Sequence, residues 1–148
     1  MRPSYALGAL AALVLPVAAL AQAPTWGPAP AVFPAGARME VLQGDPGQNA
    51  LFTVRLEFPA GYRIPAHFHP TDEHITVISG TFLVGMGDTL DAAKTKALAA
   101  GGFVTAGANM NHYAIARGRT VVQVHAMGPF VLTYVNPKDD PRNKLSSR

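Results

Sequence analysis

Short apolar, β-branched runs alternate with polar turn residues along most of this chain. The runs predict strands over residues 38–42, 51–58, 63–69, 73–78, 81–84, 103–105, 112–116, 120–125 and 131–135. Gly, Pro, Asn and Asp stand between them, as in 44–47, 59–61 and 107–109. Many short strands at this spacing predict an all-β fold, either a sandwich or a small antiparallel β-barrel.

One segment departs from this pattern. Residues 90–100 read LDAAKTKALAA, a composition of good helix formers. They predict one short surface helix between two strands, which would end at Gly101 and Gly102.

The first 21 residues have the pattern of a targeting segment. Arg2 is their only charge, residues 5–21 are mostly apolar, and Ala19-Leu20-Ala21 forms a small-x-small cleavage site. The pattern predicts a signal peptide over 1–21 that is removed before Gln22, and a periplasmic or secreted protein. A retained membrane anchor is the alternative, but the run contains Pro16 and is short for a membrane span. We therefore expect no stable membrane anchor after cleavage.

The rest of the 148-residue chain suits a single domain. Residues 22–36 contain four prolines and predict an extended, Pro-rich N-terminal extension. The β-barrel is expected over 37–136, and a polar C-terminal tail over 137–148.

Composition narrows the possible functions. The chain is 49% hydrophobic and 14% charged, which favours a packed core over disorder. Its net charge is only +3, and no block of Lys and Arg exists, so a nucleic-acid partner is not supported. The absence of Cys excludes disulfides, thiolate zinc sites, iron–sulfur clusters and cysteine nucleophiles.

Four residues are spaced as ligands of one metal ion. His67 and His69 are two apart in a predicted strand and share a face. Glu73 follows a turn at Pro70-Thr71, and His112 comes from a distant strand. Three imidazoles and a carboxylate suit one divalent transition metal, such as Fe, Mn, Ni, Co or Zn. Four protein ligands would leave positions open for a substrate or water.

Each of these residues also has an ordinary structural explanation. His67 and His69 could be surface residues of a strand, and Glu73 could be solvated. Glu73 shares its predicted face with the apolar Ile75 and Val77, however, and a carboxylate there needs a partner.

The two remaining histidines are less well placed for ligation. His74 would point to the opposite side of its strand and is expected outside the site. For His125 the sequence leaves a place in the cavity and a place on the barrel surface equally open.

The spacing resembles a known family. Residues 61–80 read GYRIPAHFHPTDEHITVISG and resemble the first cupin motif, G-x5-H-x-H-x3-E-x6-G. All of its specified positions are present, namely Gly61, His67, His69, Glu73 and Gly80. The second motif, G-x5-P-x-G-x2-H-x3-N, matches at Gly101 and His112 but has Gly107, Asn109 and Ala116 in place of Pro, Gly and Asn. Gly and Asn tolerate left-handed backbone, so the turn is expected to survive.

The resemblance implies a cupin jelly roll with a metal near one end of the barrel, and a homodimer. It also implies a metal-dependent enzyme, such as a dioxygenase or an isomerase acting on a small molecule, with Glu73 as the candidate catalytic residue. A non-catalytic metal or small-ligand binding protein is the alternative, and a barrel whose motif is purely structural is a third. The uncharacterised secreted bacterial cupins that this chain resembles have no established reaction, so the resemblance names no substrate.

Overall fold

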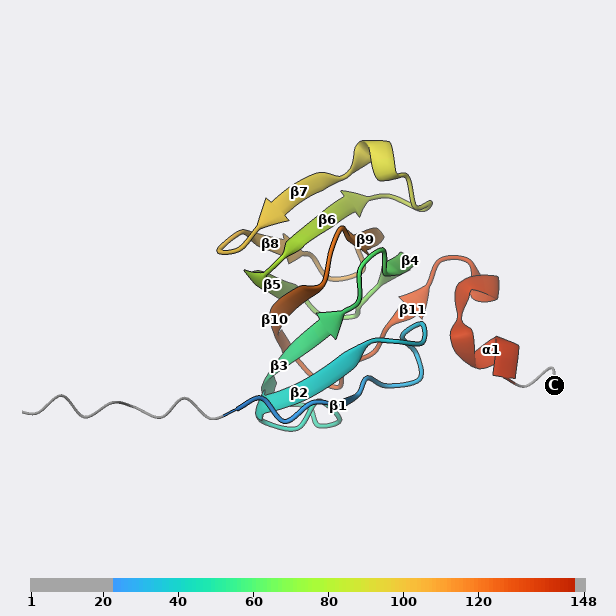
Figure 1. Cartoon of the computed structure of the whole chain (residues 1–148). Coiled ribbons are helices and arrows are strands. Elements are labelled where there is room, and N and C mark those ends of the chain that lie inside the picture. Colours follow the sequence, from blue (N-terminus) through green and yellow to red (C-terminus); the bar gives the residue numbers. More distant parts are fainter. Residues whose placement is uncertain (1–22, 146–148) are drawn as a thin grey trace, which may run out of the picture.

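Two antiparallel β-sheets face each other in the computed structural model, which describes residues 23–145 (Figure 1). The six-stranded sheet has the order β1 (Gly27–Pro28), β2 (Arg38–Gln43), β3 (Leu51–Phe58), β10 (Thr120–Met127), β5 (Glu73–Ser79) and β8 (Phe103–Ala106). The five-stranded sheet has the order β11 (Thr133–Tyr134), β4 (Arg63–Phe68), β9 (His112–Ala116), β6 (Thr81–Met86) and β7 (Lys96–Ala99).

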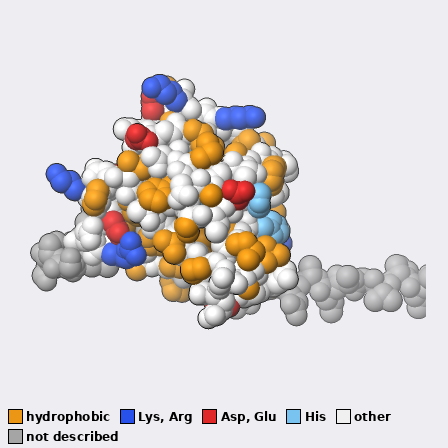
Figure 2. Space-filling view, turned by 180° about the vertical axis from the view of Figure 1, so that it is seen from behind, with side chains coloured by type: hydrophobic (Ala, Val, Ile, Leu, Met, Phe, Trp, Pro, Cys, Tyr) orange, Lys and Arg blue, Asp and Glu red, His pale blue; other side chains and the backbone are white. Residues whose placement is uncertain are grey.

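The core lies between the sheets, and strands such as β3, β5 and β10 alternate apolar positions that face it with more polar positions that do not. In β3, Phe52, Val54, Leu56 and Phe58 are buried, and the intervening side chains face the outer surface. On the face in Figure 2, hydrophobic side chains are spread over the centre, and Lys and Arg side chains lie toward the edge.

The predicted all-β, antiparallel jelly roll is confirmed. Every predicted strand has a counterpart, although the one expected over 131–135 is reduced to β11. The strands β1 and β7 were not predicted. β1 has only two residues, within the Pro-rich extension.

The helix predicted over 90–100 is wrong. The segment forms a 3-10 turn, η1 (Ala92–Lys94), and then the edge strand β7. β7 pairs with β6, and Leu98 is buried opposite Phe82. Pairing with the otherwise free edge of β6 and burial of Leu98 outweigh the helix propensity of the alanines.

The two glycines of the first motif both require glycine's backbone freedom. Gly61 has φ +76° at the turn between β3 and β4, and Gly80 has φ +81° between β5 and β6. A Cβ atom on Gly80 would also collide with the backbone oxygen of Arg119. These turns fix where the strands that carry the histidines begin and end.

The structure describes the N-terminal extension from residue 23 and the C-terminal tail as far as residue 145. The predicted signal peptide, residues 1–21, lies outside the described residues. The extension packs on the barrel and contributes Phe33 to the core. The tail carries a 3-10 turn, η2 (Pro137–Asp139), and α1 (Pro141–Leu145). Within residues 23–145, no helix is both long and apolar enough to cross a membrane.

Candidate metal centre

A β-bulge brings two of the histidines together. Ile64 of β4 is paired with Ala114 of β9, whereas His67 is paired with His112, so β4 has one extra residue between the two pairs. If the same residues were paired regularly from Ile64 onward, Ala66 would lie opposite His112 and His67 would point outward. Pro65 lies in the bulge, a place that tolerates a residue with no N–H.

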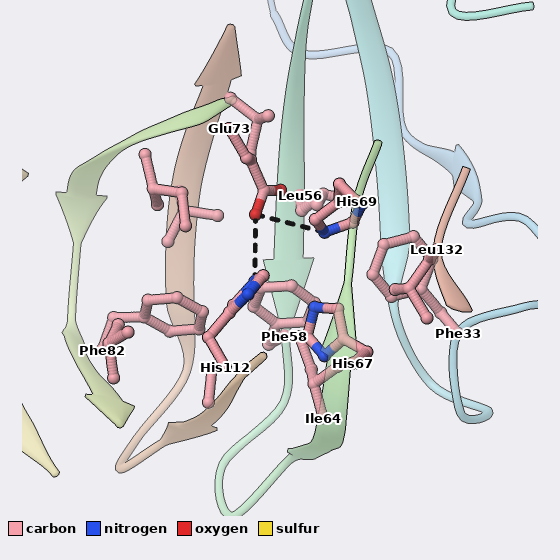
Figure 3. A pocket seen from close by; sticks show the side chains of 15 residues that line it. Phe33, Leu56, Phe58, Ile64, His67, His69, Glu73, Phe82, His112 and Leu132 are labelled. Carbon is pink, nitrogen blue, oxygen red and sulfur yellow. Dashed lines mark ion pairs between the residues drawn. The ribbon is translucent and has the colours of Figure 1, made fainter. Parts of the chain in front are cut away.

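His69 and Glu73 come from the two sides of the turn that follows β4. Glu73 is the first residue of β5 and shares its inward face with Ile75 and Val77, as the sequence predicted. Its Oε2 lies 3.3 Å from His69 Nε2 and 3.4 Å from His112 Nε2 (Figure 3). All four predicted ligands are therefore brought together, each no more than 6% exposed.

The imidazole nitrogens are oriented in the same way in all three histidines. Nδ1 of His67, His69 and His112 faces the backbone oxygens of Pro65, Val131 and Met110 at 2.7, 2.7 and 3.0 Å. A carbonyl oxygen only accepts, so each Nδ1 carries the proton and donates it. In the neutral rings, the lone pair then resides on Nε2, the form that binds a metal ion.

The three imidazole rings converge on one point. One ligand nitrogen from each of the three rings lies within 4.8 Å of the others. Those of His69 and His112 are buried and have no hydrogen-bond partner among the described residues. A buried polar atom without a partner costs free energy, and a cation between these nitrogens would remove that cost.

Burial and neighbouring charges shift the pKa values of His67, His69 and Glu73 in different directions. Burial, together with the neighbouring His112 and His69, lowers the pKa of His67 to about 3. Burial also opposes the cationic form of His69, but the adjacent Glu73 carboxylate outweighs it and the pKa of His69 is raised. Burial opposes ionisation of Glu73 too, yet contact with His112 and His69 holds its pKa well below the usual range. At neutral pH the cluster therefore holds a carboxylate beside the neutral ring of His67.

The rest of the pocket is apolar. Aliphatic and aromatic side chains line it beside the four polar residues, including Phe33, Phe58, Phe82 and Leu132. The free space that the centre of a water molecule can occupy is only about 20 Å3. About 10–15 Å3 by this measure holds one water, so the pocket accommodates one ligand of that size.

Two aromatic residues near the histidines, Phe130 and Phe33, were not predicted from the sequence. Phe130 stacks on His69 with ring centroids 5.2 Å apart, and Phe33 stacks on Phe130 at 6.1 Å. Both lie in Pro-containing segments between predicted elements, where no periodic pattern places a side chain inside or outside. Their isolated aromatic character in those segments was the only available signal.

His74 and His125 do not reach this pocket. Both are on the outer face of the six-stranded sheet, where they are cross-strand partners. The outward position expected for His74 is confirmed. For His125, which the sequence left open, the structure gives the barrel surface.

The departures in the second motif preserve its turn. Asn109 has φ +59°, the left-handed conformation expected of the residue that replaces glycine. Its N–H donates to the backbone oxygen of His69 at 2.7 Å, which joins the turn before His112 to the end of β4.

These four residues fit a divalent transition metal because they offer Nε2 lone pairs and a carboxylate, and because two of the Nε2 atoms have no hydrogen-bond partner within residues 23–145. Such a metal, when bound, polarises a ligand oxygen or activates a bound water. The chain supplies the orientation, through the three backbone oxygens behind the rings, and an apolar pocket that limits access of water.

Two antiparallel sheets closed around an inward His and Glu cluster define a double-stranded β-barrel with a candidate metal site. The chain belongs to the cupin family, since residues 54–128 match the model of the Cupin domain. A comparison with curated proteins finds no match.

Solved structures share the fold. A candidate acetylacetone dioxygenase from Methylibium petroleiphilum PM1 is 25% identical, with a TM-score of 0.60 over 80% of this chain and 79% of that chain. The polyketide cyclase RemF from Streptomyces resistomycificus is 18% identical, with a TM-score of 0.60 over 76% and 80%. An oxalate oxidase is 20% identical, with a TM-score of 0.54 over 74% and 60%. Proteins with different activities thus share this barrel, and the fold alone does not assign one of them.

Proposed function

We propose that His67, His69, His112 and Glu73 bind one divalent transition metal, and that the protein is a metal-dependent cupin oxygenase acting on a small molecule. One observation carries the proposal: three Nδ1–H groups donate to backbone oxygens, so the neutral rings leave their Nε2 lone pairs free, and two of these Nε2 atoms lie 3.3 and 3.4 Å from one carboxylate. An isomerase is the other reaction that such a site could support.

The pocket supports an oxygenase over a hydrolase. Its lining is apolar apart from the four candidate ligands, and its free space fits a diatomic molecule. An apolar pocket favours dioxygen over water, and Glu73 is the only lining carboxylate that could move a proton. The 25% identity with a candidate acetylacetone dioxygenase agrees with this choice and suggests acetylacetone as the first organic substrate to test.

The experiment compares the inner and outer histidines. Three proteins are loaded with Fe(II) without oxygen: the unaltered protein, the inner variant His67→Ala/His112→Ala and the matched outer variant His74→Ala/His125→Ala. Bound metal is then measured by elemental analysis. We expect about one iron per chain in the protein and the outer variant, and none in the inner variant. With acetylacetone, we expect oxygen uptake by the unaltered protein and the outer variant, and none by the inner variant. Absence of metal from the protein, after reconstitution with Fe, Mn, Ni, Co and Zn in turn, would contradict the proposal.

A non-catalytic metal or small-ligand binding protein is the second candidate, and the small size of the pocket favours it. A pocket for one water leaves little room for an organic substrate beside the histidines. This candidate predicts metal binding that depends on the inner histidines, with no turnover of any substrate in any metal form.

Export and dimerisation belong to the same proposal. The pattern of residues 1–21 supports cleavage before Gln22 and a periplasmic or secreted protein. Mass spectrometry of the protein from its native host would give the mature N-terminus, and light scattering would give the number of chains per particle.

A further inference from the structure

Phe33 belongs to the pocket although it comes from the Pro-rich extension. Its side chain is 5% exposed and lines the same cavity as His67, His69, Glu73 and His112. Figure 3 shows Phe33 beside Leu132, on the side of the pocket where His69 lies. Residue 33 lies outside the 54–128 stretch that matches the Cupin domain, so a segment beyond the matched residues contributes this part of the wall.

Two tyrosines fix the backbone on both sides of Phe33. The Tyr134 hydroxyl donates to the backbone oxygen of Val32 at 2.8 Å, and the Tyr62 hydroxyl donates to that of Pro34. The segment enters through a turn over 30–33, in which the Phe33 N–H donates to the Pro30 backbone oxygen at 2.9 Å. Because the backbone is held at residues 32 and 34, the intervening side chain is directed into the barrel.

The ring of Phe33 completes an aromatic series that ends at a candidate metal ligand. It stacks on Phe130 with ring centroids 6.1 Å apart and an interplanar angle of 22°, and it lies 6.5 Å from Phe58. Phe130 in turn stacks on His69. Phe33 therefore occupies volume next to the site without offering it a polar atom.

We propose that Phe33 determines the size of ligand that the site accepts, and that the extension acts as a plug which restricts the inner pocket to a water-sized or diatomic ligand. The proposal deepens the proposed function, because the pocket that Phe33 fills is the one at the candidate metal centre. Its test needs no metal, so it can fail while the metal proposal stands, and the reverse also holds.

Benzene is the probe, since apolar cavities of about 150 Å3 stay dry and bind it. We expect the metal-free protein to show no benzene binding. In Phe33→Ala, saturable binding should shift the imidazole NMR signals of His67 and His69. At ten times the dissociation constant, it should also raise Tm by about 3–6 °C.

Phe52→Ala is the matched control. Phe52 is fully buried and contacts Phe130, with ring centroids 5.5 Å apart, but it does not line the pocket. Its truncation should lower stability to a similar extent, while benzene should leave the imidazole signals unchanged.

Two results would overturn the proposal. One is benzene binding by the unaltered protein that already shifts the imidazole signals. The other is a folded Phe33→Ala protein in which benzene shifts none of them. If Phe33→Ala does not fold, Phe33→Leu is tested with xenon, and failure of xenon to shift those signals beyond its effect on the unaltered protein would equally overturn it.

Discussion

Three histidines lie inside the barrel and two lie on the outer face of the six-stranded sheet. Nδ1 of each inner ring faces a backbone oxygen, whereas Nδ1 of His74 and His125 faces the hydroxyls of Thr105 and Thr53, each at 3.0 Å. A backbone oxygen only accepts and so fixes the proton on Nδ1. A hydroxyl both donates and accepts, so it leaves the tautomer open.

The difference shows that burial and the partner of Nδ1, rather than the residue type, separate a candidate ligand from a surface histidine. His125 also has Gln123 Nε2 at 3.2 Å from its own Nε2, so that nitrogen already has a partner. Nε2 of His69 and of His112 has no hydrogen-bond partner among the described residues and faces only the Glu73 carboxylate, at 3.3 and 3.4 Å. The two outer histidines are thus internal controls for the inner three.

The largest expected difference is in metal-dependent stability. A metal present at about 1,000 times its dissociation constant stabilises the folded state by about 4 kcal/mol, which corresponds to about 10 °C in Tm for a domain of this size. A chelator should therefore lower the Tm of the loaded protein and of His125→Ala by that amount. It should leave His112→Ala unchanged in calorimetry. If the chelator lowered the Tm of His112→Ala and His125→Ala equally, the inner histidines would not differ from the outer histidines in metal binding.

The next effect is the acid sensitivity of the metal-free protein. His67 has a pKa of about 3 when folded and about 6.5 when unfolded, so below pH 6.5 only the unfolded state takes up this proton. The free energy of unfolding should fall by about 1.4 kcal/mol per pH unit, or about 2 kcal/mol between pH 6.5 and 5. His69 has a raised pKa, so its stabilising contribution is already complete below pH 6.5 and does not add to this slope.

Urea unfolding at pH 6.5 and 5 measures this slope. His67→Gln should lose the slope that His67 contributes, and His125→Gln should keep it. An unchanged slope in His67→Gln would show that another group takes up the proton.

A smaller effect concerns the charge of Glu73. In the metal-free protein the carboxylate raises the pKa of His69 against the effect of burial. In Glu73→Gln, burial, which lowers the pKa of His69 and is the largest single influence on it, is opposed only by the hydrogen bond to the Val131 backbone oxygen, so the pKa of His69 should fall below 6.5. An NMR titration of the imidazole signals measures this, with His74 as the internal reference. A pKa of His69 still above 6.5 in the variant would show that Glu73 is not the cause.

The smallest effect is expected on the outer face. Thr53 is buried, and its hydroxyl pairs with His125, so Thr53→Val should cost about 1 kcal/mol, or about 2–4 °C in Tm. Thr105→Val should cost less, because the hydrogen bond of Thr105 with His74 is exposed. Metal content should be unchanged in both variants, and a loss of metal in Thr53→Val would mean that the two regions are coupled.

Local patterns predicted most of the strands and the four clustered residues. His67, His69 and Glu73 are close in sequence, so strand period and one turn suffice to bring them together. His112 needed the register of the second motif, and Asn109 keeps that register through its left-handed backbone. These features depend on short-range geometry, which the sequence carries directly.

Long-range packing was not predictable in the same way. Residues 90–100 have helical composition, but the free edge of β6 makes part of them a strand. Phe33 and Phe130 reach the histidines only because distant segments pack together. The three backbone oxygens behind the imidazoles leave no trace in residue identity, since every residue has one.

The bulge in β4 makes the site depend on a count of residues as well as on their chemistry. Three steps along β4, from Ile64 to His67, correspond to two steps along β9. One residue added to β9 between His112 and Ala114 would match three steps with three, allow regular pairing and turn the imidazoles of His67 and His112 away from the face of Ile64, with every ligand type still present in the chain. A descendant of this protein with a single-codon insertion there would keep its barrel and its histidines and still lose the candidate metal site, and a motif search that tolerates gaps would not notice the change.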